Sequence, residues 1–189
     1  FSKRYGTLRA VESLDLEIGA GEVVALLGPN GSGKTTSLKA AAGLIAPTSG
    51  EVRLLGRPAG DPAAREILSF LPQRVSFPDA LSGREVLEFY RSLRGVEAPR
   101  VDAVLKFAAL NGSGARAVGQ YSGGMVQRLG LAVAMLPDAP VVVGSVKPAP
   151  RVKTSGCRLG SSCTHTLVVG DAKTNSETVS SVPSQRSLR

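Results

Sequence analysis

The chain has 189 residues, of which 42% are hydrophobic and 20% charged, a balance typical of one folded domain with a substantial core. No apolar run approaches the roughly 20 residues that cross a bilayer, and the longest, 129–136, predicts part of a buried helix. The net charge is +8, but residues 144–189 alone hold 7 Lys+Arg against 2 Asp+Glu and carry no aromatic side chain. A basic segment without aromatics cannot stack on bases, so we expect no nucleic-acid partner.

The first part of the chain alternates strand-like and helix-like periods, as α/β proteins do. The apolar run 22–27 predicts a buried parallel strand. After a glycine-rich loop, residues 35–45 predict a helix, because leucine and three alanines recur there with helical spacing. The turn at 48–50 then leads to a strand expected over 51–55. Strand, glycine-rich loop and helix follow one another in the order on which a phosphate-binding loop is built.

A more helical region follows. Residues 82–85 read Ser-Gly-Arg-Glu, a capping-box pattern, and predict a helix whose apolar face continues to residue 93. A second helix is expected over 100–110 and a third over 122–136, where Pro137 stops it. Residues 141–143, three valines, predict the start of another buried strand.

The composition changes after Val143. Residues 144–189 contain 14 Ser+Thr among 46 residues, three leucines and no clear period, and only 166–170 predicts a strand. Such a segment buries too little apolar surface to offset its ordering entropy. We therefore expect a basic tail over 144–189 that is mostly disordered, or that is read out of frame.

The stretch "GPNGSGKTT" fits the phosphate-loop (Walker A) pattern G-x-x-x-x-G-K-[ST]. Its glycines let successive backbone N–H groups converge on a phosphate, and the following helix adds its partial positive charge. Lys34 is expected to reach the β- and γ-phosphates, and the Thr35 hydroxyl to bind Mg²⁺. The alternative, a glycine-rich turn with an incidental lysine, does not explain why a strand precedes the loop and a helix follows it. The residues expected to bind nucleotide here are Gly28, Asn30, Gly31, Ser32, Gly33, Lys34, Thr35 and Thr36.

A second anion site is predicted where "YSGGMVQR" enters the third helix. The Ser122 hydroxyl, the N–H groups of Gly123 and Gly124 and the helix N-terminus can together hold an anion. This stretch, at this distance behind a phosphate loop, resembles the signature motif of ATP-binding-cassette (ABC) ATPases, usually L-S-G-G-Q. The resemblance covers residues 1–143.

The resemblance implies an α/β fold, a P-loop NTPase sheet with an inserted helical subdomain at about 77–120, here incomplete at its C-terminal end. Tyr5 matches the aromatic residue that stacks on adenine, although an ordinary core tyrosine is the alternative. Gln73, in "FLPQ", matches the Q-loop glutamine that contacts Mg²⁺ and the attacking water. Residues 81–95 resemble the helical region of drug or ABC-2 type exporters, while ordinary core packing would also explain their apolar side chains.

The resemblance also implies a working assembly. Its cofactors are ATP and Mg²⁺, and its signature residues Ser122, Gly123 and Gly124 act on ATP held by a second ABC subunit in a head-to-tail dimer. A separate membrane-spanning permease subunit is the other expected partner. The expected location is cytoplasmic, peripheral to the inner face of the cell membrane.

The family pattern is not matched beyond Val143. Related chains continue this strand as L-D-E-P, whereas here Ser145 stands at the place of the aspartate and Val146 at that of the glutamate. No catalytic residue is therefore identified, and the chain is expected to be impaired in ATP hydrolysis. His165 comes too early for the family's switch histidine and is interpreted as an incidental tail residue. Cys157 and Cys163 lack a standard zinc spacing with it and are expected to be free thiols.

Three functions follow as hypotheses. The leading one is the ATP-binding subunit of an ABC exporter. The second is a non-enzymatic nucleotide-binding remnant of a broken gene, which the missing carboxylates favour. The third is a soluble ABC ATPase not linked to transport, against which the exporter-like region 81–95 argues.

Overall fold

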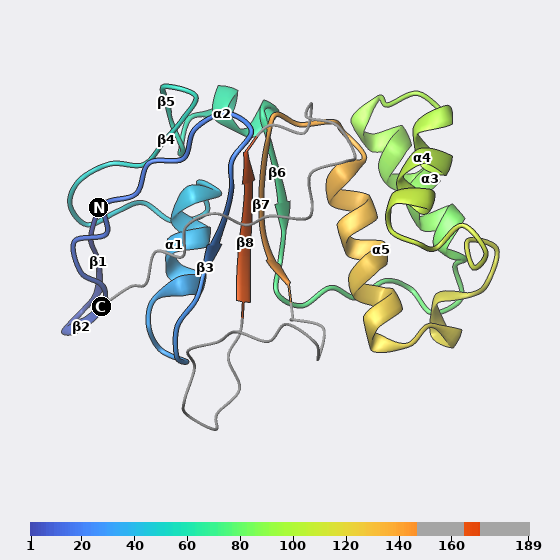
Figure 1. The fold of residues 1–189 in the computed structure, drawn as a ribbon, viewed down its shortest axis with the longest axis horizontal. Helices are drawn as coiled ribbons and strands as arrows, with labels where there is room; N and C mark the ends of the chain where they lie inside the picture. The colour runs from blue at the N-terminus through green and yellow to red at the C-terminus, as the bar shows by residue number, and fades with distance from the viewer. Residues whose placement is uncertain (147–164, 171–189) are drawn as a thin grey trace. The chain divides into compact units, whose positions relative to one another are not determined.

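The computed structural model describes residues 1–146 and 165–170 (Figure 1). Within them the chain divides into two compact units, one formed by Phe1–Phe70 with the chain from Pro140 onward, the other by Leu71–Ala139. The expected disorder of the tail and the expected free thiols Cys157 and Cys163 lie outside the described residues, apart from 144–146 and 165–170. No helix of the described segments is both long and apolar enough to cross a bilayer.

The first unit is built on a four-stranded sheet in the order β3-β8-β7-β6. Its strands are β3 (Val23–Leu26), β6 (Leu68–Leu71), β7 (Val141–Val146) and β8 (His165–Gly170). Figure 1 shows β8 between β3 and β7, and it runs antiparallel to both. Strands β3 and β7 are therefore parallel to each other, as expected, while the sheet as a whole is mixed.

Strand β7 continues three residues beyond the expected 141–143, because β8 supplies it with a partner. The two strands pair over six positions, from Val141 opposite Gly170 to Val146 opposite His165. The strand expected over 166–170 is thus present, one residue longer, and it occupies the middle of the sheet. Strand β8 pairs with β3 through residues 166–169 and with β7 along its whole length, so it covers sheet edges that residues 1–143 alone would leave open.

Helix α1 (Lys34–Ala41) packs on this sheet and is shorter than the expected 35–45. It ends early because Gly43 takes a left-handed conformation, with φ +66°. The N–H of Leu44 then bonds the carbonyl of Lys39 at 2.8 Å, which closes the helix end. The buried core of this unit comprises Leu38, Ala42, Leu54, Ala59, Ala64, Leu68 and Val143.

Short elements complete the unit. They are the hairpin of β1 (Lys3–Tyr5) and β2 (Leu8–Val11), the hairpin of β4 (Arg53–Leu54) and β5 (Arg57–Pro58), and helix α2 (Pro62–Glu66). The strand expected over 51–55 is reduced to its middle, because Leu55 and Gly56 both have positive φ, +47° and +79°, and reverse the chain. The two residues form the tight turn that a two-residue hairpin loop requires.

The second unit is helical. It contains α3 (Gly83–Arg94), α4 (Pro99–Phe107), the 3₁₀ turn η1 (Val118–Gln120) and α5 (Gly123–Met135). The capping box before α3 is confirmed: the Glu85 amide donates to the Ser82 hydroxyl at 3.2 Å, and the Ser82 amide donates to the Glu85 carboxylate at 2.7 Å. The backbone bond from Ser82, with a smaller effect of its hydroxyl, lowers the pKa of Glu85 below its usual value.

The helical unit comprises Leu71–Ala139, so it includes α5, and the helical subdomain expected at about 77–120 lies within it. Leu129 and Ala132 of α5 are fully buried in one core with apolar residues of α3 and α4. The buried core comprises Val86, Leu87, Val101, Val104, Leu105, Ala108, Leu110, Val118, Tyr121, Leu129, Ala132 and Leu136.

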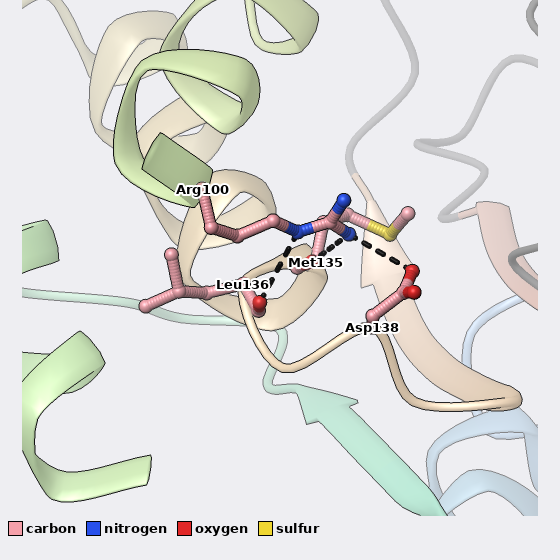
Figure 2. Close-up of polar contacts among 4 residues, drawn as sticks. All are labelled: Arg100, Met135, Leu136 and Asp138. Carbon is pink, nitrogen blue, oxygen red and sulfur yellow. Dashed lines mark hydrogen bonds and ion pairs between the residues drawn. The ribbon is translucent and has the colours of Figure 1, made fainter. Parts of the chain in front are cut away.

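Arg100 of α4 fastens the end of α5 (Figure 2). Its guanidinium donates to the carbonyl oxygens of Met135, at 2.9 Å, and Leu136, at 3.3 Å. It also pairs with the Asp138 carboxylate at 3.0 Å. The last carbonyls of a helix have no partner within the helix, so one planar cation satisfies two of them and holds the chain that leaves α5.

Candidate functional site

The glycine-rich loop joins the end of β3 to the first turn of α1. Gly31 and Gly33 have φ +86° and +84°, a left-handed conformation that side chains disfavour. A Cβ at Gly33 would lie 2.3 Å from the carbonyl oxygen of Ala10, so β2 presses directly against the loop. A Cβ at Gly28 would lie 2.8 Å from the Ser32 hydroxyl oxygen. The loop is tightly coiled, and its geometry excludes side chains at Gly33.

Lys34 curls back over this loop. Its ammonium donates to the carbonyl oxygens of Gly28, at 2.8 Å, and Pro29, at 2.7 Å, and to the Ser32 hydroxyl at 3.3 Å. The side chain is only 6% exposed. A buried ammonium needs such acceptors, and phosphate oxygens are stronger acceptors than carbonyls. The Lys34 ammonium therefore lies in the middle of the loop, where the oxygens of an anion can replace the carbonyl oxygens as its hydrogen-bond acceptors.

The start of α1 presents further groups beside Lys34. Thr35 is exposed and Thr36 half-buried, on the first helical turn, whose N–H groups have no partners within the helix. The Ser37 hydroxyl is buried and donates to the carbonyl of Gly33 at 3.1 Å. Thr35 thus has the accessible hydroxyl that a magnesium ligand needs, while Ser37 is engaged in fixing the helix start.

Tyr5 belongs to the same unit, at the end of β1. The residue is 47% exposed, and the Lys3 ammonium lies 5.1 Å from the ring centroid. Tyr5 pairs with Leu8 across the hairpin, and the following strand carries Ala10 against Gly33. The exposed tyrosine and the strand that contacts the loop therefore belong to the same hairpin. The ring of Tyr5 is accessible to a planar ligand that could stack on it.

Ser145 lies at the same end of the sheet as the loop. Across the strands, Ser145 pairs with Thr166, which pairs with Leu26, two residues before Gly28. Two strand spacings separate Ser145 from Leu26, about 10 Å. The Ser145 side chain is 4% exposed, and Val146 pairs with His165 one step further on.

The donor set for a metal ion at this end is small. No cluster of three or more His, Cys, Asp or Glu side chains occurs in the described part of the chain. Mg²⁺ prefers oxygen ligands and keeps several waters, so the exposed Thr35 hydroxyl fits it together with phosphate oxygens of a bound nucleotide. Carboxylate ligands are not offered by Ser145 or Val146.

Gln73 and the Ser122–Gly124 turn belong to the helical unit, not to the unit that carries the loop. The Gln73 carbonyl accepts a hydrogen bond from the Gln127 side-chain amide at 3.5 Å. Ser122 is the N-cap of α5, its hydroxyl accepting from the Met125 amide at 3.3 Å. Ser122, Gly123 and Gly124 are all exposed, so the N-terminus of α5 opens to the outside of its unit.

Tyr121 is a residue whose role the sequence analysis missed. Its ring is 9% exposed, and its hydroxyl donates to the carbonyl of Ser113 at 2.7 Å. A Cβ at Gly83 would lie 2.2 Å from that hydroxyl oxygen, so Tyr121 fills the space over the start of α3. Burial raises the pKa of Tyr121 above its usual value, and Arg116 opposes the rise. The signal was a tyrosine where the signature motif usually has leucine, since a buried tyrosine needs a hydrogen-bond partner.

Comparison with known proteins identifies the family of this chain. A family model described as "ABC transporter" matches residues 11–143. An uncharacterised ABC transporter ATP-binding protein of Bacillus subtilis (strain 168), YxlF, is 41% identical over 138 residues, 71% of this chain and 46% of that protein. The daunorubicin resistance ATP-binding protein DrrA3 of Streptomyces coeruleorubidus is 35% identical over 74% of this chain and 46% of its own length. The sulfate/thiosulfate import ATP-binding protein CysA of Thermosynechococcus vestitus is 36% identical over 75% of this chain and 44% of its own length.

Solved structures agree on the fold. An ATP-binding subunit of an ABC transporter superposes with a TM-score of 0.65, at 24% identity, over 76% of this chain and 62% of that one. A putative ABC transporter ATP-binding protein from Pyrococcus furiosus gives 0.55 at 29% identity, over 62% of this chain and 58% of the other. The expected fold class is confirmed, and the chain spans about half the length of the curated relatives it matches.

Proposed function

This chain belongs to the ABC transporter family of ATP-binding proteins, and on that premise we propose that it is the ATP-binding subunit of an exporter, able to bind MgATP but impaired in hydrolysing it. The observation that carries the proposal is the Lys34 ammonium, buried in a loop of left-handed glycines and held by the carbonyl oxygens of Gly28 and Pro29. This cradle is shaped for phosphate oxygens and for no apolar ligand.

Contacts to the phosphates and to adenine are assigned to residues of the unit that carries the loop. The backbone N–H groups of Gly28 and of residues 30–36 hold the phosphates, Lys34 neutralises them, and Thr35 would bind Mg²⁺ through its exposed hydroxyl. The ring of Tyr5, an exposed residue, stacks on adenine. Magnesium, when bound, neutralises charge on the β- and γ-phosphates. Gln73, on the helical unit, is proposed as a further contact to the metal and the attacking water.

Hydrolysis needs a group that polarises water next to the γ-phosphate, and no described residue is assigned to that step. Ser145 and Val146 end β7 at the loop end of the sheet. A serine hydroxyl is a weak base and a valine side chain is no base at all. We therefore assign binding without appreciable turnover to this chain, although ATP hydrolysis is the activity of its family.

Coupling to transport is assigned to the helical unit. The exposed Ser122–Gly124 turn of α5 would cap ATP held by a second ABC subunit in a head-to-tail dimer. The Gln73 loop and residues 77–95 would contact a membrane-spanning permease from the cytoplasmic face. Transport direction rests on the exporter-like stretch 81–95 and on the drug-resistance relative, while a sulfate/thiosulfate import protein is similarly related.

Two experiments test the proposal. A fluorescent ATP analogue titrated into the full chain should bind with Mg²⁺ present, and absence of binding would overturn the function. Co-purification with a multi-span membrane protein encoded beside its gene would support the transport role. A soluble ABC ATPase would purify without one, and a nucleotide-binding remnant, which Ser145 and Val146 favour, would bind ATP without any such partner.

A further inference from the structure

The segment that carries Gln73 rests on one side of α5. A Cβ at Gly130 would lie 3.0 Å from both methyl carbons of Val75 and 3.1 Å from a methyl carbon of Leu71. Those distances are shorter than ordinary van der Waals contacts, so the absence of a side chain at Gly130 lets the segment 71–75 approach the helix. Gln127 lies one turn earlier on α5 and contacts the same segment at Gln73.

The Gln127 side chain is unusual because only one end of its amide is satisfied. Its nitrogen donates to the Gln73 carbonyl at 3.5 Å, while its oxygen is buried and has no hydrogen-bond partner in the described part of the chain. Turning the amide over would place two carbonyl oxygens against each other. A buried acceptor without a partner is destabilising, and methionine, of similar length, would fill the space without that cost. Packing alone therefore does not account for a glutamine here.

We propose that Gln127 is a positioning residue for Gln73, fixing the backbone of its loop to the helix whose first turn is Ser122–Gly124. Residues 71–75 pack on this side of α5 at Gly130 and are hydrogen-bonded to it by the Gln127 amide. The loop and the exposed helix start then share one rigid support, since only about one and a half helical turns separate Ser122 from Gln127. The functional consequence rests on the proposed role of Gln73 at the metal.

The structural part is tested by hydrogen exchange on the full chain. Gln127→Met removes the donor and the unpartnered acceptor together, so we expect an unchanged or higher melting temperature. At the same time, amides of residues 73–76 should exchange roughly two- to tenfold faster, the range for loss of one weak hydrogen bond. Gln120→Met is the matched control, because Gln120 is exposed on η1 of the same unit. Faster exchange spread evenly over α3, α4 and α5, or none, would overturn the proposal.

A second variant keeps the test informative if methionine repacks the site. Gly130→Ala leaves Gln127 intact but adds the Cβ that Val75 and Leu71 would have to avoid. Exchange over 73–76 should again rise while that of α5 itself does not, because alanine favours the helix. If the amides of residues 73–76 exchange as slowly as in the parent chain, the loop does not depend on α5 for its position.

The functional part is tested by the ratio of ATP affinities with and without Mg²⁺. Gln73→Ala removes any contact of this side chain to the metal and shows how far the affinity ratio falls without it. Gln127→Met should lower the same ratio by a smaller amount, while the affinity for ATP without Mg²⁺ stays constant. If Gln127→Met keeps the affinity ratio of the parent chain while Gln73→Ala lowers it, the positioning role is overturned. If ATP fails to bind the parent chain, the proposed function falls, and the exchange experiment still decides whether Gln127 holds the loop.

Discussion

The ammonium nitrogen of Lys34 lies 2.8 Å from the carbonyl oxygen of Gly28, the first residue of the loop that ends at Lys34 itself. A second bond, of 2.7 Å, reaches the carbonyl of Pro29. The Lys34 side chain thereby joins the end of the loop to its beginning and places its positive charge inside the loop. Backbone carbonyls are modest partners for a buried cation, so the loop is already arranged to receive phosphate oxygens in their place.

Lys34→Ala should weaken ATP binding by about 1.5–3 kcal/mol, or roughly 10- to 150-fold, because it removes a charge-assisted contact to phosphate. Titration of a fluorescent ATP analogue into both proteins measures the change. Lys39→Ala, an exposed lysine on the same helix, is the matched control and should bind like the parent chain. Equal affinities of the parent and Lys34→Ala would show that the loop is not the site.

Two glycines of the loop should respond differently to alanine. Gly31→Ala meets no atom within 4 Å and only strains the backbone, at about 1 kcal/mol of unfolding free energy. Gly33→Ala meets the Ala10 carbonyl as well, and the strain and clash together should cost about 3 kcal/mol or more. Urea unfolding of the three proteins measures both values. Similar losses for the two variants would mean that β2 does not press against the loop.

Local patterns in the sequence predicted much of this fold. The spacing of Ser82 and Glu85 predicted a capping box, and the structure has it. Ser122 before two glycines predicted a helix start, and α5 begins there with Ser122 as its N-cap. These features depend on groups three residues apart, which a sequence displays directly. The phosphate loop was predictable for the same reason, since its strand, glycines and helix are consecutive.

Contacts between distant segments were not predictable in this way. Nothing in the tail indicated that β8 would pair with both β3 and β7, because pairing partners depend on the whole sheet. The pressure of Ala10 on Gly33 and the bond from Tyr121 to Ser113 are equally non-local. The register that brings Ser145 level with Leu26 also required the structure.

Tyr121→Phe removes only the hydroxyl that donates to Ser113. We expect a loss of about 1–2 kcal/mol in unfolding free energy near neutral pH. Because burial raises the pKa of Tyr121 in the folded state, the unfolded chain ionises first as the pH rises. The tyrosine's contribution is therefore complete below pH about 10 and is lost above it. Between pH 8 and about 11, the unfolding free energy should fall more steeply with pH for the parent chain than for Tyr121→Phe. An equal pH dependence in the two proteins would contradict the buried placement of Tyr121.

Arg100→Ala should destabilise the helical unit by about 1.5–3 kcal/mol, since it leaves the carbonyls of Met135 and Leu136 without their donor. Thermal or urea unfolding measures the loss. Arg84→Ala is the control, because Arg84 makes an exposed ion pair with Asp102, a kind of pair worth about 0–1 kcal/mol. Equal losses in the two variants would show that Arg100 does not hold the end of α5.

Phosphate release from excess MgATP, measured on purified full chain whose nucleotide binding has been verified in the same sample, tests the central claim most directly. Loss of a general base typically costs 10²–10⁴-fold in rate, and Ser145 and Val146 supply neither a base nor a carboxylate ligand for the metal. The account predicts release no faster than that of Lys34→Ala, the blank. Turnover on the order of 1 s⁻¹, a usual scale for working enzymes, that disappears in Lys34→Ala would contradict it.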